Sequence, residues 1–282
     1  MEVKKVGIIG AGVMGMGIAQ KMICYDKEVI LVDNDASVVN SVKNRIQRNM
    51  MIARITNKDN TDIAHALSLL SVTDDYSALS GCDHIIENIP ENEDMKYEVY
   101  RKLSDIVSEN CICMANTSCI SITKIAKWLG NSPNVIGVHF MNPVPLQKFA
   151  EVIKGNFTSD DTIEKVKSFL KEIEIDCTVI NDSVGFVSNR LSHLFMNEAI
   201  NLVMEGVATP EQIDQIFTEG FHHSMGPLHT ADLIGLDTVM YSLNVLYQNY
   251  QDPKYRCSPL LRKMVDSGLL GRKSGKGFFE YY

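Results

Sequence analysis

His139 is the histidine that this sequence places best for proton transfer. It directly follows the apolar run Val135–Val138, and open α/β sheets bind ligands at the carboxyl ends of their parallel strands. A near-neutral imidazole can take the hydroxyl proton when a hydride leaves an alcohol carbon. Glu151, twelve residues further on, could orient the ring and raise its basicity. A purely structural role for this histidine is about as frequent, so both interpretations stay open at this point.

Two polar residues could complete such a site. Ser118 follows another apolar run, Cys111–Ala115, and its hydroxyl could hydrogen-bond a substrate oxygen or cap the helix that follows. Asn189 lies near the start of a predicted helix, Phe186–Glu205. Its amide could reach a substrate, although a cap or a solvent contact is the commoner role.

A glycine-rich loop between a predicted strand and a predicted helix indicates a dinucleotide site, and it contains Gly10, Gly12, Val13, Met14 and Gly15. In such loops the first glycine makes a tight turn, the second lets backbone approach a pyrophosphate, and the third lets helix pack on strand. The helix N-terminus then favours the phosphate charge. Asp33 ends the next strand, eighteen residues after Gly15, where a carboxylate binds ribose hydroxyls and repels a 2′-phosphate. The sequence therefore predicts NAD rather than NADP.

A second glycine cluster, Gly271–Gly277, superficially resembles a phosphate loop. It fails the GxxxxGK[ST] template, because Lys276 stands where that template needs glycine.

Strands and helices alternate through the first two thirds of the chain, which predicts a Rossmann-type, doubly wound, mostly parallel sheet. After residue 183 the apolar spacing becomes helical, so we expect a nucleotide-binding domain at 1–183 and an all-helical domain at 184–282. The predicted strands are 4–10, 28–33, 83–87, 111–115 and 134–138, and the predicted helices are 16–25, 36–55, 93–108, 121–129, 186–205, 210–220 and 230–250. A polar break is expected at 57–61.

Composition excludes several classes of function. The 282 residues carry a net charge of −8, which argues against a nucleic-acid partner. No apolar run approaches the ~20 residues of a membrane span. Seven cysteines without zinc-ligand spacing predict buried thiols, a cytoplasmic protein and no metal.

Eight motifs, taken together and in order, resemble the 3-hydroxyacyl-CoA dehydrogenase family, and most closely its bacterial 3-hydroxybutyryl-CoA dehydrogenase branch. They are Gly10–Gln20, Ala115–Thr123, Gly137–Pro145, Glu151–Ile153, Gly185–Arg190, Asn197–Ala199, Gly226–Leu228 and Leu270–Phe278.

The resemblance implies an NAD-dependent enzyme that interconverts a 3-hydroxyacyl thioester and its 3-ketoacyl form, with 3-hydroxybutyryl-CoA and acetoacetyl-CoA as the first candidates. It implies that His139 is the catalytic base, that Glu151 is its partner, and that Ser118 and Asn189 contact the substrate. It also implies a homodimer in which the helical domain closes over the substrate. The remaining implied dinucleotide contacts are Asp33, Glu91, Lys96, Asn116, Asn142 and Lys273.

The region around residues 49–58 departs from the family pattern. Asn49 and Thr56 stand where the family uses a Ser and a Lys for the CoA moiety, and Arg54 and Lys58 are the basic residues left nearby. Losing a charge-assisted contact to the CoA 3′-phosphate costs about 1.5–3 kcal/mol. CoA remains the first candidate carrier, and an acyl-carrier-protein thioester in polyketide extender-unit synthesis is the alternative.

Two further alternatives are weaker. The β-hydroxyacid dehydrogenases share the glycine loop, but their catalytic lysine motif is missing here. An NAD-binding, crystallin-like structural protein would not need Ser118, His139, Glu151 and Asn189 together.

Overall fold

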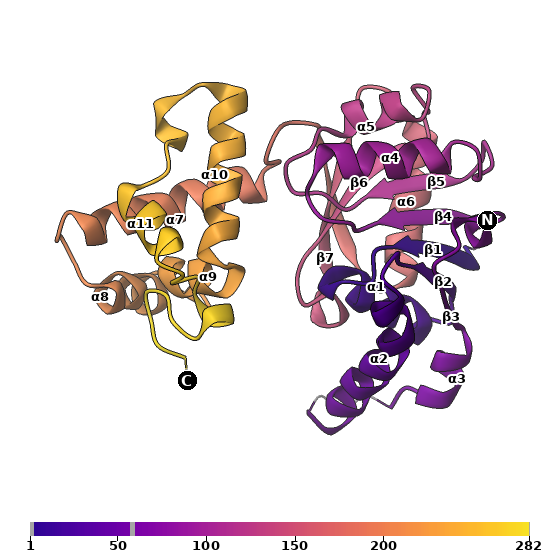
Figure 1. Ribbon diagram of the computed structural model, residues 1–282, viewed down its shortest axis with the longest axis horizontal. Helices are drawn as coiled ribbons and strands as arrows, with labels where there is room; N and C mark the ends of the chain where they lie inside the picture. Colours follow the sequence, from indigo (N-terminus) through magenta and orange to yellow (C-terminus); the bar gives the residue numbers. More distant parts are fainter. Residues whose placement is uncertain (1–2, 57–59, 282) are drawn as a thin grey trace. The chain divides into compact units, whose positions relative to one another are not determined.

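The computed structural model describes residues 3–56 and 60–281. The chain forms two compact units, Met1–Asp182 and Ser183–Tyr282 (Figure 1). Within the described ranges, no helix has the length and apolarity needed to span a membrane.

The first unit contains one eight-stranded sheet with the order β3-β2-β1-β4-β5-β6-β7-β8. Strands β1 to β6 are parallel, β7 runs antiparallel to β6, and β8 is parallel to β7. The predicted doubly wound, mostly parallel sheet is confirmed, and the reversed pair at its edge is new. The strands are β1 Lys5–Ile9, β2 Glu28–Val32, β3 Leu70–Thr73, β4 His84–Glu87, β5 Ile112–Ala115, β6 Val135–Phe140, β7 Phe149–Lys154 and β8 Asp176–Asn181.

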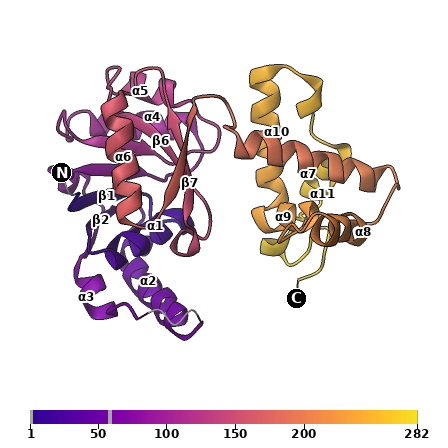
Figure 2. The same cartoon turned by 180° about the vertical axis from the view of Figure 1, so that it is seen from behind.

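Helices cover both faces of this sheet (Figures 1 and 2). The face carrying Ile8, Leu31 and Val138 packs against α1, α2, α3 and α6 in one continuous apolar core, while α4 and α5 lie on the opposite face. Alternate residues of each strand point to opposite faces of the sheet. Because helices cover both faces, the residues that point to either face are apolar. The helices are α1 Val13–Cys24, α2 Ala36–Thr56, α3 Ile63–Ser68, α4 Glu93–Leu103, α5 Ile122–Trp128 and α6 Asp160–Glu172.

The second unit is helical, around a core that includes Ile200, Leu228, Leu243 and Leu261. Its helices are α7 Ser188–Met204, α8 Pro210–Gln215, α9 Pro227–Ile234, α10 Leu236–Tyr250 and α11 Pro259–Asp266, with a π-helical segment, η3, at Ile216–Gly220.

Two predicted helices need correction. The segment 230–250 is divided between α9 and α10 by Gly235, whose φ of 103° is incompatible with a continuous right-handed helix. The segment 93–108 is helical only to Leu103, and the Ser104 hydroxyl donates to the Arg101 carbonyl at 2.7 Å. Such local side-chain bonds favour helix ends over helix interiors. The predicted break at 57–61 falls largely outside the described residues.

Candidate active site

His139 and Glu151 face each other across two antiparallel strands. They are directly paired in the β6–β7 register, and His139 Nδ1 lies 3.0 Å from Glu151 Oε2. Both side chains are largely buried, with 13% and 7% of their surface exposed. The twelve-residue separation is thus the length of one hairpin, which turns through a short 3₁₀ segment, η2, at Val144–Leu146. A carboxylate on Nδ1 keeps a proton there and leaves Nε2 as the acceptor.

Ser118 lies on the other side of the ring, with Oγ 3.4 Å from His139 Nε2. The loop that carries it follows β5, the strand next to β6. Glu91 holds this loop through one carboxylate oxygen, Oε1, which accepts from the Thr117 hydroxyl at 2.6 Å and the Cys119 amide at 2.8 Å. Glu91 therefore fixes the position of Ser118.

The glycine loop opens onto a cavity of about 870 Å³ at the carboxyl ends of β1, β2 and β4. A Cβ added to Gly15 would lie 1.8 Å from the Gly10 carbonyl oxygen, whereas one at Gly12 would meet nothing within 4 Å. The close helix–strand packing and the open approach to backbone are what a pyrophosphate site needs. Asp33 lines the same cavity, and its Oδ2 accepts from the Ala11 amide at 2.7 Å. Val13 and Met14 line it as well, so these residues fit a dinucleotide with its ribose on Asp33.

Lys96 is fully buried beneath this region. Its ammonium lies 2.6 and 2.8 Å from the two carboxylate oxygens of Glu87 and 4.0 Å from Glu91. Burial raises the pKa of the Glu87 carboxyl, and the Lys96 ammonium opposes that rise. Since Glu87 Oε1 also accepts from the Ile89 amide at 2.8 Å, the pair orders the loop that follows β4.

The two asparagines predicted at the cofactor site have different surroundings. Asn116 donates from Nδ2 to Asn88 Oδ1 at 2.7 Å and accepts from the Phe140 amide at 3.3 Å, so it connects β4, β5 and β6 at their carboxyl ends. Asn142 lines a separate groove of about 310 Å³, formed by α1, α2 and the residues after β6.

This groove contains the positions at which the sequence departs from the family. Asn49 and Thr56 line it, together with apolar residues such as Ile52 and Leu146. Neither Lys nor Arg occurs among the described residues that line the groove. Arg54 is exposed on the last turn of α2, and Lys58 lies outside the described residues.

Asn189 and Lys273 belong to the second unit, so the structure does not relate them to His139. Asn189 is in the first turn of α7, and its carbonyl oxygen lies 2.8 Å from His193 Nδ1. Lys273 pairs with Asp237 at 2.6 Å.

The rejected phosphate-loop motif, Gly271–Gly277, has a structural role. A Cβ at Gly277 would lie 2.1 Å from Asp232 Oδ1. Asp232 is fully buried and accepts from the Phe278 and Phe279 amides at 3.1 and 3.0 Å. The glycines therefore let the C-terminal turn close around this carboxylate.

Sequence reasoning missed several residues that line the dinucleotide cavity because they come from other elements. Arg45 lies on α2, Tyr76 lies after β3, and Asp94, Glu98 and Lys102 lie on α4. Burial raises the pKa of Tyr76, and the charges of Asp33 and Glu87 add to the rise. None of these positions belongs to a recognisable motif; only the packing of the helices brings them to the loop.

The fold and the site define a dinucleotide-dependent oxidoreductase with a histidine–carboxylate pair beside the cofactor sheet. Residues 5–183 match the model for the NAD-binding domain of 3-hydroxyacyl-CoA dehydrogenase, and residues 185–281 match that for its C-terminal domain. The chain therefore belongs to the 3-hydroxyacyl-CoA dehydrogenase family, as the sequence motifs predicted.

Full-length relatives agree with this assignment. A probable 3-hydroxybutyryl-CoA dehydrogenase of Deinococcus radiodurans is 43% identical over 277 residues, which cover 98% of this chain and 100% of the relative. The crystal structure of (S)-3-hydroxybutyryl-CoA dehydrogenase PaaH1 from Ralstonia eutropha is similar with a TM-score of 0.94 at 39% identity, and that of FadB2 from Mycobacterium tuberculosis with 0.97 at 33%. Both comparisons cover 100% of each chain.

Proposed function

We propose that the protein interconverts 3-hydroxybutyryl-CoA and acetoacetyl-CoA, with NAD as cofactor and His139 as the proton acceptor and donor. The observation that carries this proposal is the placement of the His139 ring between Glu151 at 3.0 Å and Ser118 at 3.4 Å. The glycine loop and Asp33 would hold NAD, which would supply the acceptor for the hydride of the carbinol carbon. The relatives named as 3-hydroxybutyryl-CoA dehydrogenases support the substrate class.

His139, Glu151 and Ser118 have different roles in the proposed reaction. Nδ1–H of His139 donates to the Glu151 carboxylate, so the lone pair of Nε2 can take the substrate hydroxyl proton. The imidazolium that results is stabilised by the carboxylate charge at 3.0 Å. The Ser118 hydroxyl, held through Glu91, lies where it can hydrogen-bond the same substrate oxygen. In the reverse direction His139 returns the proton to the carbonyl oxygen as the alcohol forms.

Residues whose roles rest on family resemblance complete the proposal. Asn189 contacts the substrate, and Lys273 and Asn142 contact the dinucleotide. Lys96 contributes to cofactor binding through the loop that it orders with Glu87. We also propose a homodimer and a cytoplasmic location.

A direct assay tests the central proposal. Purified protein with NADH and acetoacetyl-CoA should oxidise NADH, followed at 340 nm. Removing a general base usually costs about 10²–10⁴-fold in rate, so His139→Gln should lose at least 10²-fold in kcat while binding NADH normally. His65→Gln, an exposed histidine on α3, is the matched control. Full activity in the His139 variant would overturn the assignment of the base.

The groove lined by Asn49 is relevant to whether the acyl group is carried by CoA or by an acyl carrier protein. Its apolar and amide lining suits a pantetheine arm, and the absence of Lys and Arg from its described lining favours a carrier-protein thioester as the second candidate. The values of kcat/KM for acetoacetyl-CoA, the acetoacetyl pantetheine thioester and a carrier-protein thioester distinguish them. CoA should be preferred if Arg54 and Lys58 meet its phosphates, and Arg54→Ala should then raise KM for CoA alone. Equal values for CoA and pantetheine would exclude a CoA-specific role.

A further inference from the structure

Two half-buried asparagines form a row of hydrogen bonds across the carboxyl ends of three neighbouring strands. Asn88 follows β4, Asn116 follows β5, and Phe140 is the last residue of β6. The Phe140 amide donates to Asn116 Oδ1 at 3.3 Å, and Asn116 Nδ2 donates to Asn88 Oδ1 at 2.7 Å. Asn88 Nδ2 in turn donates to the Ile86 carbonyl at 3.1 Å. We call this row the Asn88–Asn116 bridge.

Backbone groups at both ends of the bridge fix the orientation of its amides. The N–H group of Phe140 can only donate, and the carbonyl of Ile86 can only accept. Each asparagine must therefore turn its oxygen toward Phe140 and its nitrogen toward Ile86. An amide meets this requirement because it carries an acceptor and a donor side by side. A leucine of similar size provides neither.

The bridge connects the strand of the catalytic histidine with the glycine loop. At one end it holds the amide of Phe140, which directly follows His139. At the other end, the Asn88 amide donates to the Ile9 carbonyl at 2.8 Å, and a Cβ added to Gly10 would lie 2.9 Å from the Asn88 carbonyl oxygen. Asn88 also lines the dinucleotide cavity. The backbone that carries His139 is thus tied to the backbone that shapes this cavity.

Asn116 lies between the two groups that contact the substrate oxygen in the proposed reaction. Its side chain holds the residue after His139, and its backbone leads to Ser118 two residues later. Its own amide donates to the Glu87 carbonyl at 2.9 Å. A displacement of Asn116 would therefore move His139 and Ser118 relative to each other. A shift of about 1 Å at a reacting centre can cost about 10²-fold in rate.

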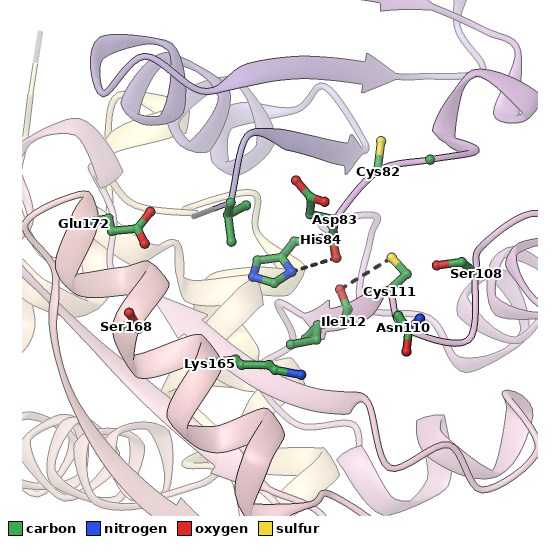
Figure 3. A pocket seen from close by; sticks show the side chains of 12 residues that line it. Cys82, Asp83, His84, Ser108, Asn110, Cys111, Ile112, Lys165, Ser168 and Glu172 are labelled. Carbon is green, nitrogen blue, oxygen red and sulfur yellow. Dashed lines mark hydrogen bonds between the residues drawn. The ribbon is translucent and has the colours of Figure 1, made fainter. Parts of the chain in front are cut away.

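The amino ends of β4 and β5 are held differently. They lie beside a cavity of about 380 Å³ (Figure 3). There His84 Nδ1 lies 2.8 Å from the carbonyl oxygen of its neighbour Asp83, and the Asp83 carboxylate accepts from the Lys5 amide of β1 at 3.0 Å. These bonds join β4 to itself and to β1. The Asn88–Asn116 bridge instead joins β4, β5 and β6, at the end of the sheet that carries His139.

We propose that Asn116, anchored by Asn88, is a positioning residue that holds His139 in place relative to the dinucleotide cavity. This inference rests on the proposed function, because it requires His139 to transfer a proton beside that cavity. In this role Asn116 acts through the Phe140 amide and the end of β6. Its loss should misplace the proton donor and leave the binding of NADH and of the thioester nearly unchanged.

Asn116→Leu and Asn88→Leu test the bridge in the whole protein, with NADH and acetoacetyl-CoA as substrates. We expect Asn116→Leu to lower kcat by about 10–100-fold, with KM for acetoacetyl-CoA and Kd for NADH nearly unchanged. Asn88→Leu should lower kcat less, since the bond to the Phe140 amide remains. The double variant should be no slower than Asn116→Leu, because Asn88 acts through Asn116.

A count of NADH sites separates positioning from a loss of folded protein. Fluorescence titration with NADH gives the number of sites, and kcat expressed per site does not fall when fewer molecules are folded. Asn134→Leu is the matched control, since Asn134 is also half-buried and donates to the Glu109 carbonyl at 2.6 Å, just before β6. This variant should lower the Tm and leave kcat per site unchanged.

The possible outcomes decide between the alternatives. An unchanged kcat per site in Asn116→Leu would overturn the inference, and so would an equal fall in Asn134→Leu. A loss that appears in KM or in Kd for NADH, with kcat unchanged, would show that Asn116 contacts a substrate instead. An unmodified protein that does not oxidise NADH would overturn the proposed function, and this inference with it. Asn116→Ser, too short to reach both partners, replaces Asn116→Leu if that variant fails to fold.

Discussion

The opposite ends of the parallel strands hold two largely buried histidines whose partners differ. His139, toward the carboxyl end of β6, shares Nδ1 with the Glu151 carboxylate, whereas His84, at the amino end of β4, shares Nδ1 with a backbone carbonyl. Both partners fix the same tautomer, with Nε2 as acceptor. A carboxylate carries a full negative charge and stabilises a charged ring more strongly than a carbonyl does, while burial lowers the pKa of His84. The partner on Nδ1, rather than burial alone, decides what the ring can do.

Strand β4 shows the same contrast within four residues. At its carboxyl end Glu87 points toward α4 and meets the Lys96 ammonium with both oxygens. At its amino end His84 points to the opposite face, against Phe169 on α6. At the carboxyl end of β4, the buried Glu87 has the Lys96 ammonium as its counter-charge. At the amino end, the buried His84 ring is neutral.

Lys96→Met should produce the largest effect, because it removes the counter-charge from Glu87. Breaking one partner of a buried ion pair usually costs about 3–5 kcal/mol, and urea denaturation should show a loss of that size in the free energy of unfolding. Lys124→Met, which breaks an exposed pair with Glu93, should cost less than about 1 kcal/mol. Equal losses in the two variants would contradict the contrast between the strand ends.

Glu151→Gln should come next, since it makes the partner of His139 neutral like that of His84. We expect kcat to fall about 10²-fold, near 2.7 kcal/mol, with NADH affinity unchanged. Glu174→Gln, at an exposed position, should leave kcat unchanged. An unaltered kcat in the Glu151 variant would show that the carboxylate does not assist proton transfer by His139.

His84→Phe should have the smallest effect on the pH dependence of a measured property, in this case stability. The pKa of His84 is lowered in the folded protein from about 6.5 in the unfolded chain. Its neutral ring therefore supports folding above pH 6.5, and that support is lost as the pH falls through 6.5, since the unfolded state binds a proton that the folded state excludes. The variant should lose less of its Tm than the unmodified protein between pH 7.5 and pH 5.5. An equal loss in both proteins would show that His84 is protonated in the folded state.

Much of the first unit could be predicted because its signals are local. The glycine loop and Asp33 predicted the dinucleotide site, since turn geometry and ribose binding require those residue types at that spacing. The apolar runs predicted β4, β5 and β6, because a buried strand needs consecutive apolar residues in one short segment of the chain. The prediction of a single helix at 230–250 was wrong. The helical period continues in the sequence on both sides of Gly235, and only the backbone conformation shows the break.

Most contacts between segments that are distant along the chain could not be predicted from the sequence. The reversal of β7 against β6 places Glu151 opposite His139, and the apolar runs did not predict β7 as a strand. Arg45, Tyr76 and Lys102 reach the dinucleotide cavity because α2 and α4 pack beside the glycine loop.

The sequence by itself determined the family, the fold class, the cofactor and the identity of the residues able to carry the chemistry, because these depend on residue types and on spacing along the chain. The tertiary structure decided which partner each buried group obtained. Hydrogen bonds and ion pairs act over about 3 Å, so the ammonium on Glu87 and the backbone carbonyl on His84 became visible only once the strands and helices were packed.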